Sequence, residues 1–235
     1  MNKNNKITIG ILGGMGPYAS LAFMKKLLDL TQAKKDWEHL RIVMDNNPHI
    51  PSRTRAFLYN ENSPVEGMVE SCKKLANYPV DIILLPCNSA TYFLPQVQKE
   101  IGIPILSIVE ATCTSLKNKF KKGTGIVVWG GTITHSTHLY APHLQQLGYV
   151  YIKMDQGDNQ TITNIIEDIK LNNEKADIGK IRTHIEHTLK KYNCSVIILG
   201  CSEFGCIIEL LAGYPIIDSD TEYAKYVIEL AKENV

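Results

Sequence analysis

The sequence predicts an α/β fold of two pseudo-symmetric three-layer domains with mostly parallel sheets. Short apolar runs alternate with amphipathic stretches along the whole chain, which is the pattern of strands joined by crossover helices. A set of landmarks also occurs twice in the same order, which indicates two halves of similar fold. The matched landmarks are Gly13-Gly14 with Gly130-Gly131, Cys87 with Cys201, and Gly102-Ile-Pro-Ile with Gly213-Tyr-Pro-Ile.

In the first half, runs rich in Ile, Leu and Val are typical of parallel strands, because such strands are covered on both faces. They predict strands at Ile7–Leu12, Leu40–Met44, Ile82–Leu85 and Ile105–Ile108. Between them, apolar residues recur every three or four positions, which is the spacing of one helix face. This spacing predicts helices at Ala19–Thr31, Pro64–Leu75 and Phe93–Ile101.

The second half repeats the alternation for the same physical reasons. Its apolar runs predict strands at Thr124–Val128, Val150–Lys153, Ser195–Leu199 and Ile216–Asp218. Its amphipathic stretches predict helices at Glu110–Lys119, Thr137–Leu147, Thr161–Lys170 and Ile178–Tyr192, with a closing helix at Tyr223–Lys232.

The two halves are expected to exchange one helix. The last helix, after Asp220, should cross back to the first half, because its counterpart near Glu110 begins the second half. The predicted domains are therefore 1–108 plus 220–235, and 109–219. Ligand pockets are common at domain interfaces, so we expect the active site in the cleft between the domains.

Composition excludes several classes of function. The 235 residues carry 25 Lys plus Arg and 24 Asp plus Glu, a formal net charge of +1, which argues against a general nucleic-acid binder. Apolar runs are too short to span a membrane, and Met1–Lys6 leads into a strand rather than a signal peptide. The six cysteines are therefore expected to be free thiols in a cytoplasmic enzyme.

A glycine-rich turn, Gly10-Ile-Leu-Gly-Gly-Met-Gly-Pro17, follows the first predicted strand. From Gly14 to Ala19 it satisfies the dinucleotide pattern G-x-G-x-x-A, but no acidic residue ends a strand about 20 positions later. Three interpretations stay open. The turn holds a small carboxylate with its backbone N–H groups, it is a tight turn without ligand, or it binds a nucleotide.

Cys87 and Cys201 each follow an apolar run and precede hydrogen-bonding residues, in the strings Pro-Cys-Asn-Ser and Gly-Cys-Ser-Glu. Each thiol is therefore expected at the carboxyl end of a parallel strand, where α/β sheets bind ligands. A nearby helix N-terminus should lower its pKa and suit it to proton transfer. The alternative is a small buried packing residue, which we favour for Cys72, Cys113, Cys194 and Cys206.

Other polar residues are placed to face the same cleft. The prolines of Pro48-His-Ile-Pro-Ser-Arg-Thr-Arg55 predict an extended loop that projects Arg53, whereas Arg55 is expected at the surface. The turn around Thr132 offers hydroxyl and N–H groups to a second anion. His135, His138 and His143 lack a carboxylate in register, so we predict no metal site.

Four motifs in order resemble the aspartate/glutamate racemase family over nearly the whole chain. They are Gly13-Gly-Met-Gly-Pro17, Ile50-Pro-Ser-Arg-Thr54, Pro86-Cys-Asn-Ser-Ala90 and Gly200-Cys-Ser-Glu203. The resemblance implies an amino-acid racemase that needs no pyridoxal phosphate or other cofactor, an active site between two α/β domains, and a homodimer. It leaves open whether aspartate, glutamate or another amino acid is the substrate.

Family roles are carried over by position. Cys87 and Cys201 resemble the paired acid and base, with Cys201 acting on the L-isomer and Cys87 on the D-isomer. The implied substrate-binding residues are Asn88, Ser89, Ser202 and Thr132 at the α-carboxylate, Asn47, Arg53 and Lys170 at the side-chain carboxylate, and also Met15 and Glu203. Trp129 and Phe204 depart from the family pattern, which bears on the fit of the substrate.

Two rival functions remain at this point. One is an isomerase or decarboxylase of small dicarboxylates on the same scaffold, although such relatives usually alter the cysteine pair. The other is a non-catalytic module that binds a small anion or a nucleotide. A purely structural role for the two cysteines is not a third rival, because it does not explain why both are followed by polar residues in matched turns. The intact cysteine pair favours the racemase.

Overall fold

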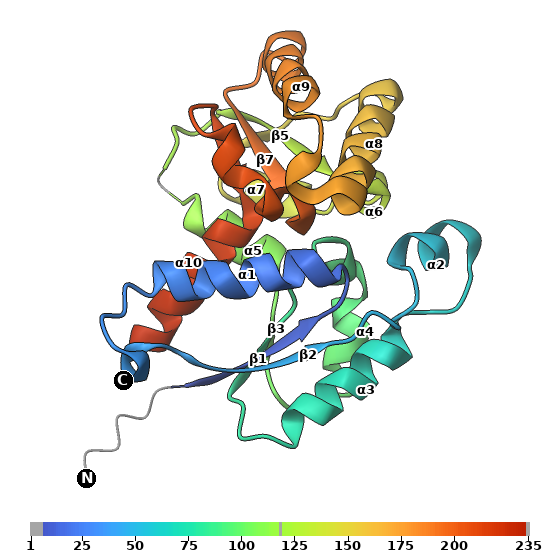
Figure 1. Cartoon of the computed structure of the whole chain (residues 1–235). Coiled ribbons are helices and arrows are strands. Elements are labelled where there is room, and N and C mark those ends of the chain that lie inside the picture. The colour runs from blue at the N-terminus through green and yellow to red at the C-terminus, as the bar shows by residue number, and fades with distance from the viewer. Residues whose placement is uncertain (1–6, 118, 234–235) are drawn as a thin grey trace.

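The structure is a computed structural model that describes residues 7–117 and 119–233. Within these residues, two four-stranded sheets have only parallel strand pairs, which confirms the predicted α/β class (Figure 1). Their strand orders are β2-β1-β3-β4 and β6-β5-β7-β8, so the second sheet repeats the first. The expectation about Met1–Lys6 lies outside the described residues.

Each predicted strand is present, with ends that differ by at most two residues. The first sheet holds β1 (Thr8–Gly13), β2 (Arg41–Asn46), β3 (Ile82–Leu84) and β4 (Ile105–Leu106). The second holds β5 (Gly125–Gly130), β6 (Val150–Tyr151), β7 (Val196–Gly200) and β8 (Ile216–Asp218). Because β3 ends at Leu84 and β7 at Gly200, Cys87 and Cys201 follow corresponding strands of the two sheets.

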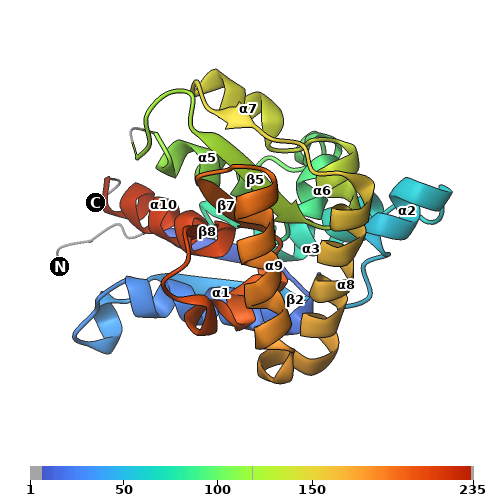
Figure 2. The ribbon, with the colours of Figure 1, turned by 90° about the horizontal axis from the view of Figure 1, so that it is seen from above.

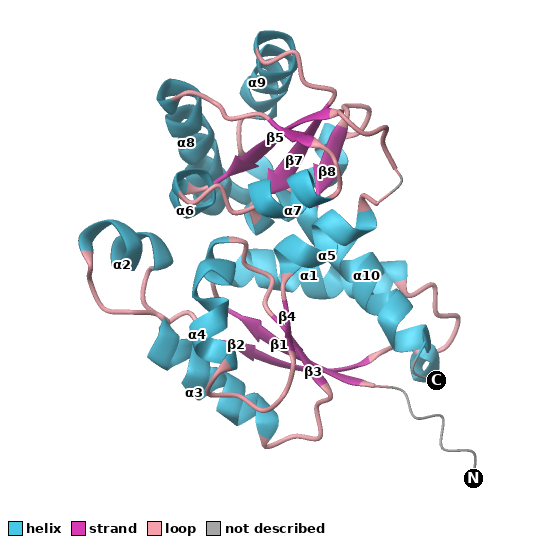
Figure 3. Cartoon of the chain, turned by 180° about the vertical axis from the view of Figure 1, so that it is seen from behind, coloured by secondary structure: helices cyan, strands magenta, loops and turns pink. Residues whose placement is uncertain are grey.

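Helices cover both faces of each sheet (Figure 3). The longer ones are α1 (Pro17–Leu30), α3 (Val65–Ala76), α8 (Gln156–Asn172), α9 (Ile178–Lys191) and α10 (Ser219–Glu233), and the shorter ones include α4 (Leu94–Gln98) and α5 (Ile108–Ser115). No helix in the described part of the chain is both long and apolar enough to cross a membrane.

The strand residues alternate between two apolar clusters, as the period of a strand requires. In the first sheet, Leu84 packs with Phe23 of α1, whereas its neighbour Ile83 packs with Met68 of α3. In the second sheet, Ile198 belongs to the same cluster as Leu84, whereas Ile197 faces α8 and α9. One apolar cluster therefore runs continuously between the two sheets.

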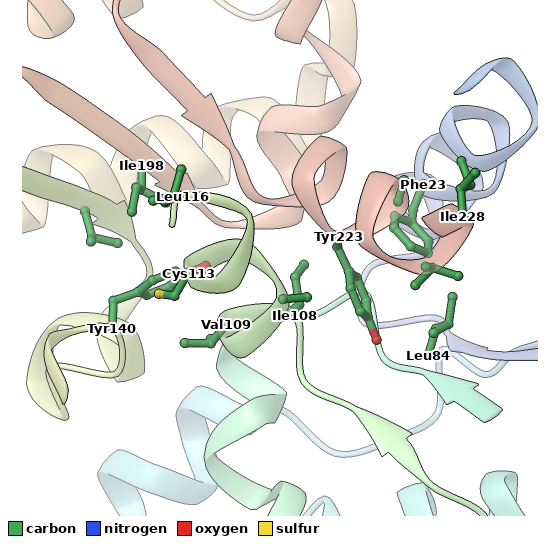
Figure 4. Close-up of a cluster of buried hydrophobic side chains, with 14 of the residues drawn as sticks. Phe23, Leu84, Ile108, Val109, Cys113, Leu116, Tyr140, Ile198, Tyr223 and Ile228 are labelled. Carbon is green, nitrogen blue, oxygen red and sulfur yellow. The ribbon is translucent and has the colours of Figure 1, made fainter. Parts of the chain in front are cut away.

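α5 and α10 form the centre of that shared cluster (Figures 2 and 4). Val109 of α5 and Leu116 just after it belong to this cluster together with Ile198 of the second sheet. Tyr223 of α10 stacks on Phe23 of α1 in the first half. The helix that closes the chain thus contacts α1 of the first half as well as β7 and β8 of the second. The two halves consequently share buried apolar surface, which resists their separation.

Several segments differ from the prediction. The expected helix Thr137–Leu147 is shortened to α7 (Ala141–Gln146), and a separate short helix, α6 (Thr132–Ser136), precedes it; His138, between them, has a left-handed backbone with φ of 50°. The expected helix Phe93–Ile101 is shortened to α4 and preceded by a 3₁₀ turn. The expected extended loop after Pro48 becomes α2 (Arg53–Tyr59), which Ser52 caps by accepting from the Arg55 N–H.

The hydroxyl of Tyr223 joins two strand ends of the first sheet. It accepts from the Leu85 N–H at 3.2 Å and donates to the Leu106 carbonyl at 2.6 Å. Tyr223→Phe should therefore lower the free energy of unfolding by about 1–3 kcal/mol, because two buried backbone groups lose their partner. Urea unfolding measures this change. Tyr226→Phe on the same helix is the control and should have little effect; an equal loss in both variants contradicts the assignment.

Candidate active site

A cavity of about 330 Å³ lies where loops from the two sheets meet. Its walls come from the turns that follow β1, β3, β5 and β7, and from α2 and α8. Ten of the eleven predicted site residues line it: Met15, Arg53, Cys87, Asn88, Ser89, Thr132, Lys170, Cys201, Ser202 and Glu203. Carboxyl ends of parallel strands from both halves therefore converge on one polar site.

The two thiols share this cavity but have different partners. Cys87 Sγ lies 3.6 Å from the Ser89 hydroxyl oxygen and is 5% exposed. Cys201 Sγ donates a hydrogen bond to Glu203 Oε2 at 2.8 Å. The carboxylate that the sequence placed among the substrate ligands thus contacts a thiol directly, and Glu203 is itself buried.

Burial raises the pKa of Cys201 well above that of a free thiol, and the negative charge of Glu203 and its hydrogen bond add to this shift. The expected lowering of this pKa by a helix N-terminus is therefore wrong for Cys201. The helix that follows is a 3₁₀ helix, Ser202–Cys206, and the adjacent carboxylate outweighs its dipole. Ionisation of Cys201 requires an acceptor for its proton, and Glu203 is in place to be one.

Arg53 presents a guanidinium that backbone carbonyls hold against the cavity. Its Nη1 donates to the carbonyl of Pro51 at 3.2 Å, and its Nη2 donates to that of Met15 at 3.2 Å. Its Nε is buried and has no hydrogen-bond partner among the described residues. Arg55 also lines the cavity, but its side chain is exposed and pairs with Glu61 at 2.6 Å. Arg53 is therefore a fixed cation suited to a ligand carboxylate.

The turn after β1 requires glycine and positions Met15. Gly14 has φ of +92°, and a Cβ there would lie 2.2 Å from the backbone of Asn47. This close approach explains the glycines without a nucleotide. Asn47, however, lies away from the cavity lining: its amide donates to Ser71 and accepts from the His49 N–H. Asn47 thus shapes the turn, which corrects its expected place in the site.

The Asn88 side chain is already committed within the protein. Its Nδ2 donates to the Ser219 hydroxyl at 3.1 Å, and its Oδ1 accepts from the Tyr140 hydroxyl at 2.5 Å. One amide hydrogen and the carbonyl oxygen of Asn88 are therefore already engaged within the protein. The backbone N–H groups of Ser89 and Ser202 find no acceptor among the described residues, and these two residues line the cavity. They are the better candidates to bind a carboxylate.

The turn after β5 contributes hydroxyl groups. Thr132 and Thr134 line the cavity, and Thr134 Oγ1 is buried without a partner in the described structure. His135 lies beside them, and burial lowers its pKa to about 4, which keeps the imidazole neutral. No group of three or more potential ligands that could hold a metal ion is found among the described residues.

The α8 helix supplies residues that the sequence argument overlooked. Thr163, Ile166 and Glu167 line the cavity together with the predicted Lys170, at the spacing of one helix face. Lys170 Nζ lies 2.7 Å from Glu167 Oε1. Burial favours a lower pKa for Lys170, but the nearby Glu203, Glu167 and Cys201 outweigh it and raise the pKa. The spacing of these residues, three or four positions apart, could have indicated in the sequence that they share a helix face with Lys170.

Comparison with known proteins agrees with this geometry. The model of the family described as Asp/Glu/Hydantoin racemase matches residues 12–227. The chain belongs to this family. It is 26% identical to the broad specificity amino-acid racemase RacX of Bacillus subtilis, over 94% of this chain and 96% of that protein.

Solved structures of relatives have the same fold. The aspartate racemase of Picrophilus torridus is 29% identical and superposes with a TM-score of 0.80, covering 96% of this chain and 94% of that one. An aspartate racemase homologue from Pyrococcus horikoshii is 21% identical, with a TM-score of 0.74 over 96% and 99% of the two chains. The curated and structural relatives are thus amino-acid racemases, and the two-domain α/β architecture is the family's own.

Proposed function

We propose that this protein is a cofactor-independent racemase of an acidic amino acid, aspartate or glutamate, and that Cys87 and Cys201 are its two bases. The observation that carries the proposal is the pair of thiols at corresponding strand ends of two matching sheets, lining one cavity. A reaction that moves a proton from one face of a carbon to the other needs a proton acceptor and a proton donor on opposite sides. Two related half-sites supply that arrangement.

The proposed reaction transfers protons in a fixed order. Cys201 Sγ passes its proton to Glu203 Oε2, and the resulting thiolate removes the α-proton of the substrate. The Cys87 thiol then protonates the opposite face of the carbanion, which inverts the carbon. Water afterwards returns a proton to Cys87 and takes the one held by Glu203. The reverse direction uses the same groups in the opposite order.

The cavity also has to stabilise the negative charge that develops on the α-carboxylate. Backbone N–H groups of Ser89 and Ser202 and the buried Thr134 hydroxyl are fixed dipoles for this purpose. Their positions are set before the substrate binds, so they stabilise the transition state without reorganising.

The cations of the site favour a dicarboxylic substrate. Arg53→Ala should raise the KM for aspartate and glutamate about 10-fold or more, because a charged hydrogen bond to the second carboxylate is lost. The KM for a neutral amino acid should change little. Steady-state kinetics with both substrate classes measures the difference, and Arg55→Ala is the matched control. An equal rise in KM for acidic and neutral amino acids would show that Arg53 does not bind the side-chain carboxylate.

The proposed activity is tested with the dialysed protein and no added cofactor. L-Aspartate, L-glutamate and L-alanine are incubated separately, and the products are resolved by chiral chromatography. Formation of the D-isomer of an acidic substrate supports the proposal, and the same rate with hydroxylamine present supports independence from pyridoxal phosphate. Release of CO₂ without racemisation points to a decarboxylase instead. Binding without any turnover points to a sensor of small anions.

The proposal includes a division of the chain and an assembly state. We propose domains 1–108 plus 220–235, and 109–219, since α10 contacts α1 and its Tyr223 bonds to Leu85 and Leu106 of the first half, while α5 contacts α7 of the second. We also propose a homodimer in the cytoplasm, on the family resemblance. Light scattering at micromolar concentration tests the dimer, which should give twice the mass of the chain; a single-chain mass contradicts it.

A further inference from the structure

The first turn of α10 lies against both cysteine loops. Ser219, Asp220 and Tyr223, which we call the α10 brace, are all fully buried. Figure 4 shows the Tyr223 ring reaching from α10 between Ile108 and Leu84. None of the three lines the cavity, so their polar groups are directed at other parts of the protein.

Toward the first half, the brace holds the chain on both sides of Cys87. The Asn88 amide donates to Ser219 Oγ at 3.1 Å, and the Leu85 N–H donates to Tyr223 at 3.2 Å. Cys87 lies between these two attachment points in the sequence. The backbone that carries its thiol is therefore tied to one helix turn.

Toward the second half, the brace holds the residue that follows Cys201. Ser202 Oγ and Asp220 Oδ1 are 2.8 Å apart, and both side chains are buried. Asp220 Oδ2 is buried and finds no partner among the described residues. A Cβ at Gly205 would lie 3.0 Å from that oxygen, so the loop after Cys201 is fitted closely around the carboxyl group.

The surroundings of Asp220 favour its neutral form. Burial and the negative charge of Asp218 raise the pKa of Asp220 well above its usual value, although Lys26 and Ser202 oppose this shift. Asp220 Oδ1 accepts the hydrogen of the Ser202 hydroxyl in either protonation state, since a proton can reside on Oδ2. This hydrogen bond holds Ser202, which lines the cavity and whose backbone N–H has no acceptor among the described residues.

We propose that Asp220 is a positioning residue: by accepting the hydrogen of the Ser202 hydroxyl it holds Ser202 in place and directs the Ser202 backbone N–H toward the substrate carboxylate. Because Ser219 and Tyr223 hold the Cys87 loop in the same helix turn, the α10 brace also fixes the two cysteine loops relative to each other. This inference rests on the proposed racemase function. It assigns a catalytic consequence to a buried carboxyl group that takes no part in the proton transfers above.

The test compares variants of the full chain in the racemisation assay. Asp220→Asn should keep kcat within about 3-fold, because the amide is similar in shape and its oxygen can accept the hydrogen of Ser202. Asp220→Ala and Asp220→Leu should lower kcat about 10-fold or more, the second without leaving a cavity. In a Ser202→Ala background, Asp220→Ala should change kcat less than about 3-fold, because the two residues act as one unit.

Glu222→Gln is the control, since Glu222 lies in the same helix but pairs with Lys119 and Lys225 instead. The inference is overturned if Asp220→Asn loses as much activity as Asp220→Leu, or if the losses of Asp220→Ala and Ser202→Ala multiply. If Asp220→Ala does not fold, the kcat of Asp220→Asn is compared with that of Asp220→Leu, and this comparison tests the inference. If the wild-type protein shows no racemisation, the proposed function is contradicted rather than the role of the α10 brace. The brace is then tested by the rate of Cys201 alkylation in the same variants. This rate should differ from wild type in Asp220→Leu and should equal it in Asp220→Asn.

Discussion

Replacing either Cys87 or Cys201 by alanine should lower the rate of racemisation by about 10³-fold or more. Each thiol serves as proton acceptor in one direction and proton donor in the other, and general acid–base groups of this kind contribute about 10² to 10⁴ each. Loss of one thiol therefore stops inversion in both directions. The measurement is the initial rate of D-isomer formation from the L-substrate, and of the reverse reaction, by chiral chromatography.

The other buried cysteines supply the control. Cys72 and Cys113 are packed in apolar clusters and do not line the cavity, so neither is placed to exchange a proton with a substrate there. Cys72→Ala and Cys113→Ala should retain racemisation if the protein folds. Substantial activity in Cys87→Ala or Cys201→Ala would contradict the two-base account. Exchange of the α-proton with solvent deuterium in each variant identifies the isomer that the remaining thiol serves.

The second large effect is expected at Glu203. Glu203→Gln should lower kcat about 10²-fold, because the glutamine amide cannot accept the Cys201 proton as a base. The same change should make Cys201 easier to ionise. The carboxylate charge disfavours a neighbouring thiolate, so its removal lowers the pKa of Cys201 and moves the pH midpoint of iodoacetamide alkylation to lower values.

These two effects have opposite signs, which separates a base from a merely repulsive neighbour. Slower racemisation together with easier alkylation supports the proposed role of Glu203. Unchanged racemisation in Glu203→Gln would show that water accepts the Cys201 proton. Glu167→Gln is the matched control, since Glu167 also lines the cavity but pairs with Lys170 rather than with a thiol. It should leave the midpoint of Cys201 alkylation nearly unchanged.

The sequence predicts the sheets well because their strands are buried on both faces. Ile82 and Ile83 contact different helix layers, yet both must be apolar, so the strand reads as one continuous run. Strand ends and the two cysteines follow from the same pattern. The left-handed backbone of His138 could not be predicted, since no glycine or asparagine stands at this position to signal it.

The side chains of the site were predicted by position better than by role. Asn88 was placed correctly at the cavity, but its amide is bonded to Tyr140 and Ser219, which lie far away in the sequence. The raised pKa of Cys201 depends on the rotamer of Glu203 and on burial, which outweigh the local helix dipole. Such roles are set by tertiary contacts, and a motif alone does not specify them.

The central claim, proton transfer between two thiols across one carbon, is tested most directly by racemisation in D₂O. L-Aspartate is followed by proton NMR, and the two isomers are separated early in the reaction and analysed for deuterium at the α-carbon. The account predicts deuterium in the newly formed D-isomer, while the recovered L-isomer keeps its proton, because removal and delivery use different groups. A D-isomer that retains the original proton, or equal early labelling of both isomers, would indicate a single base and contradict the account.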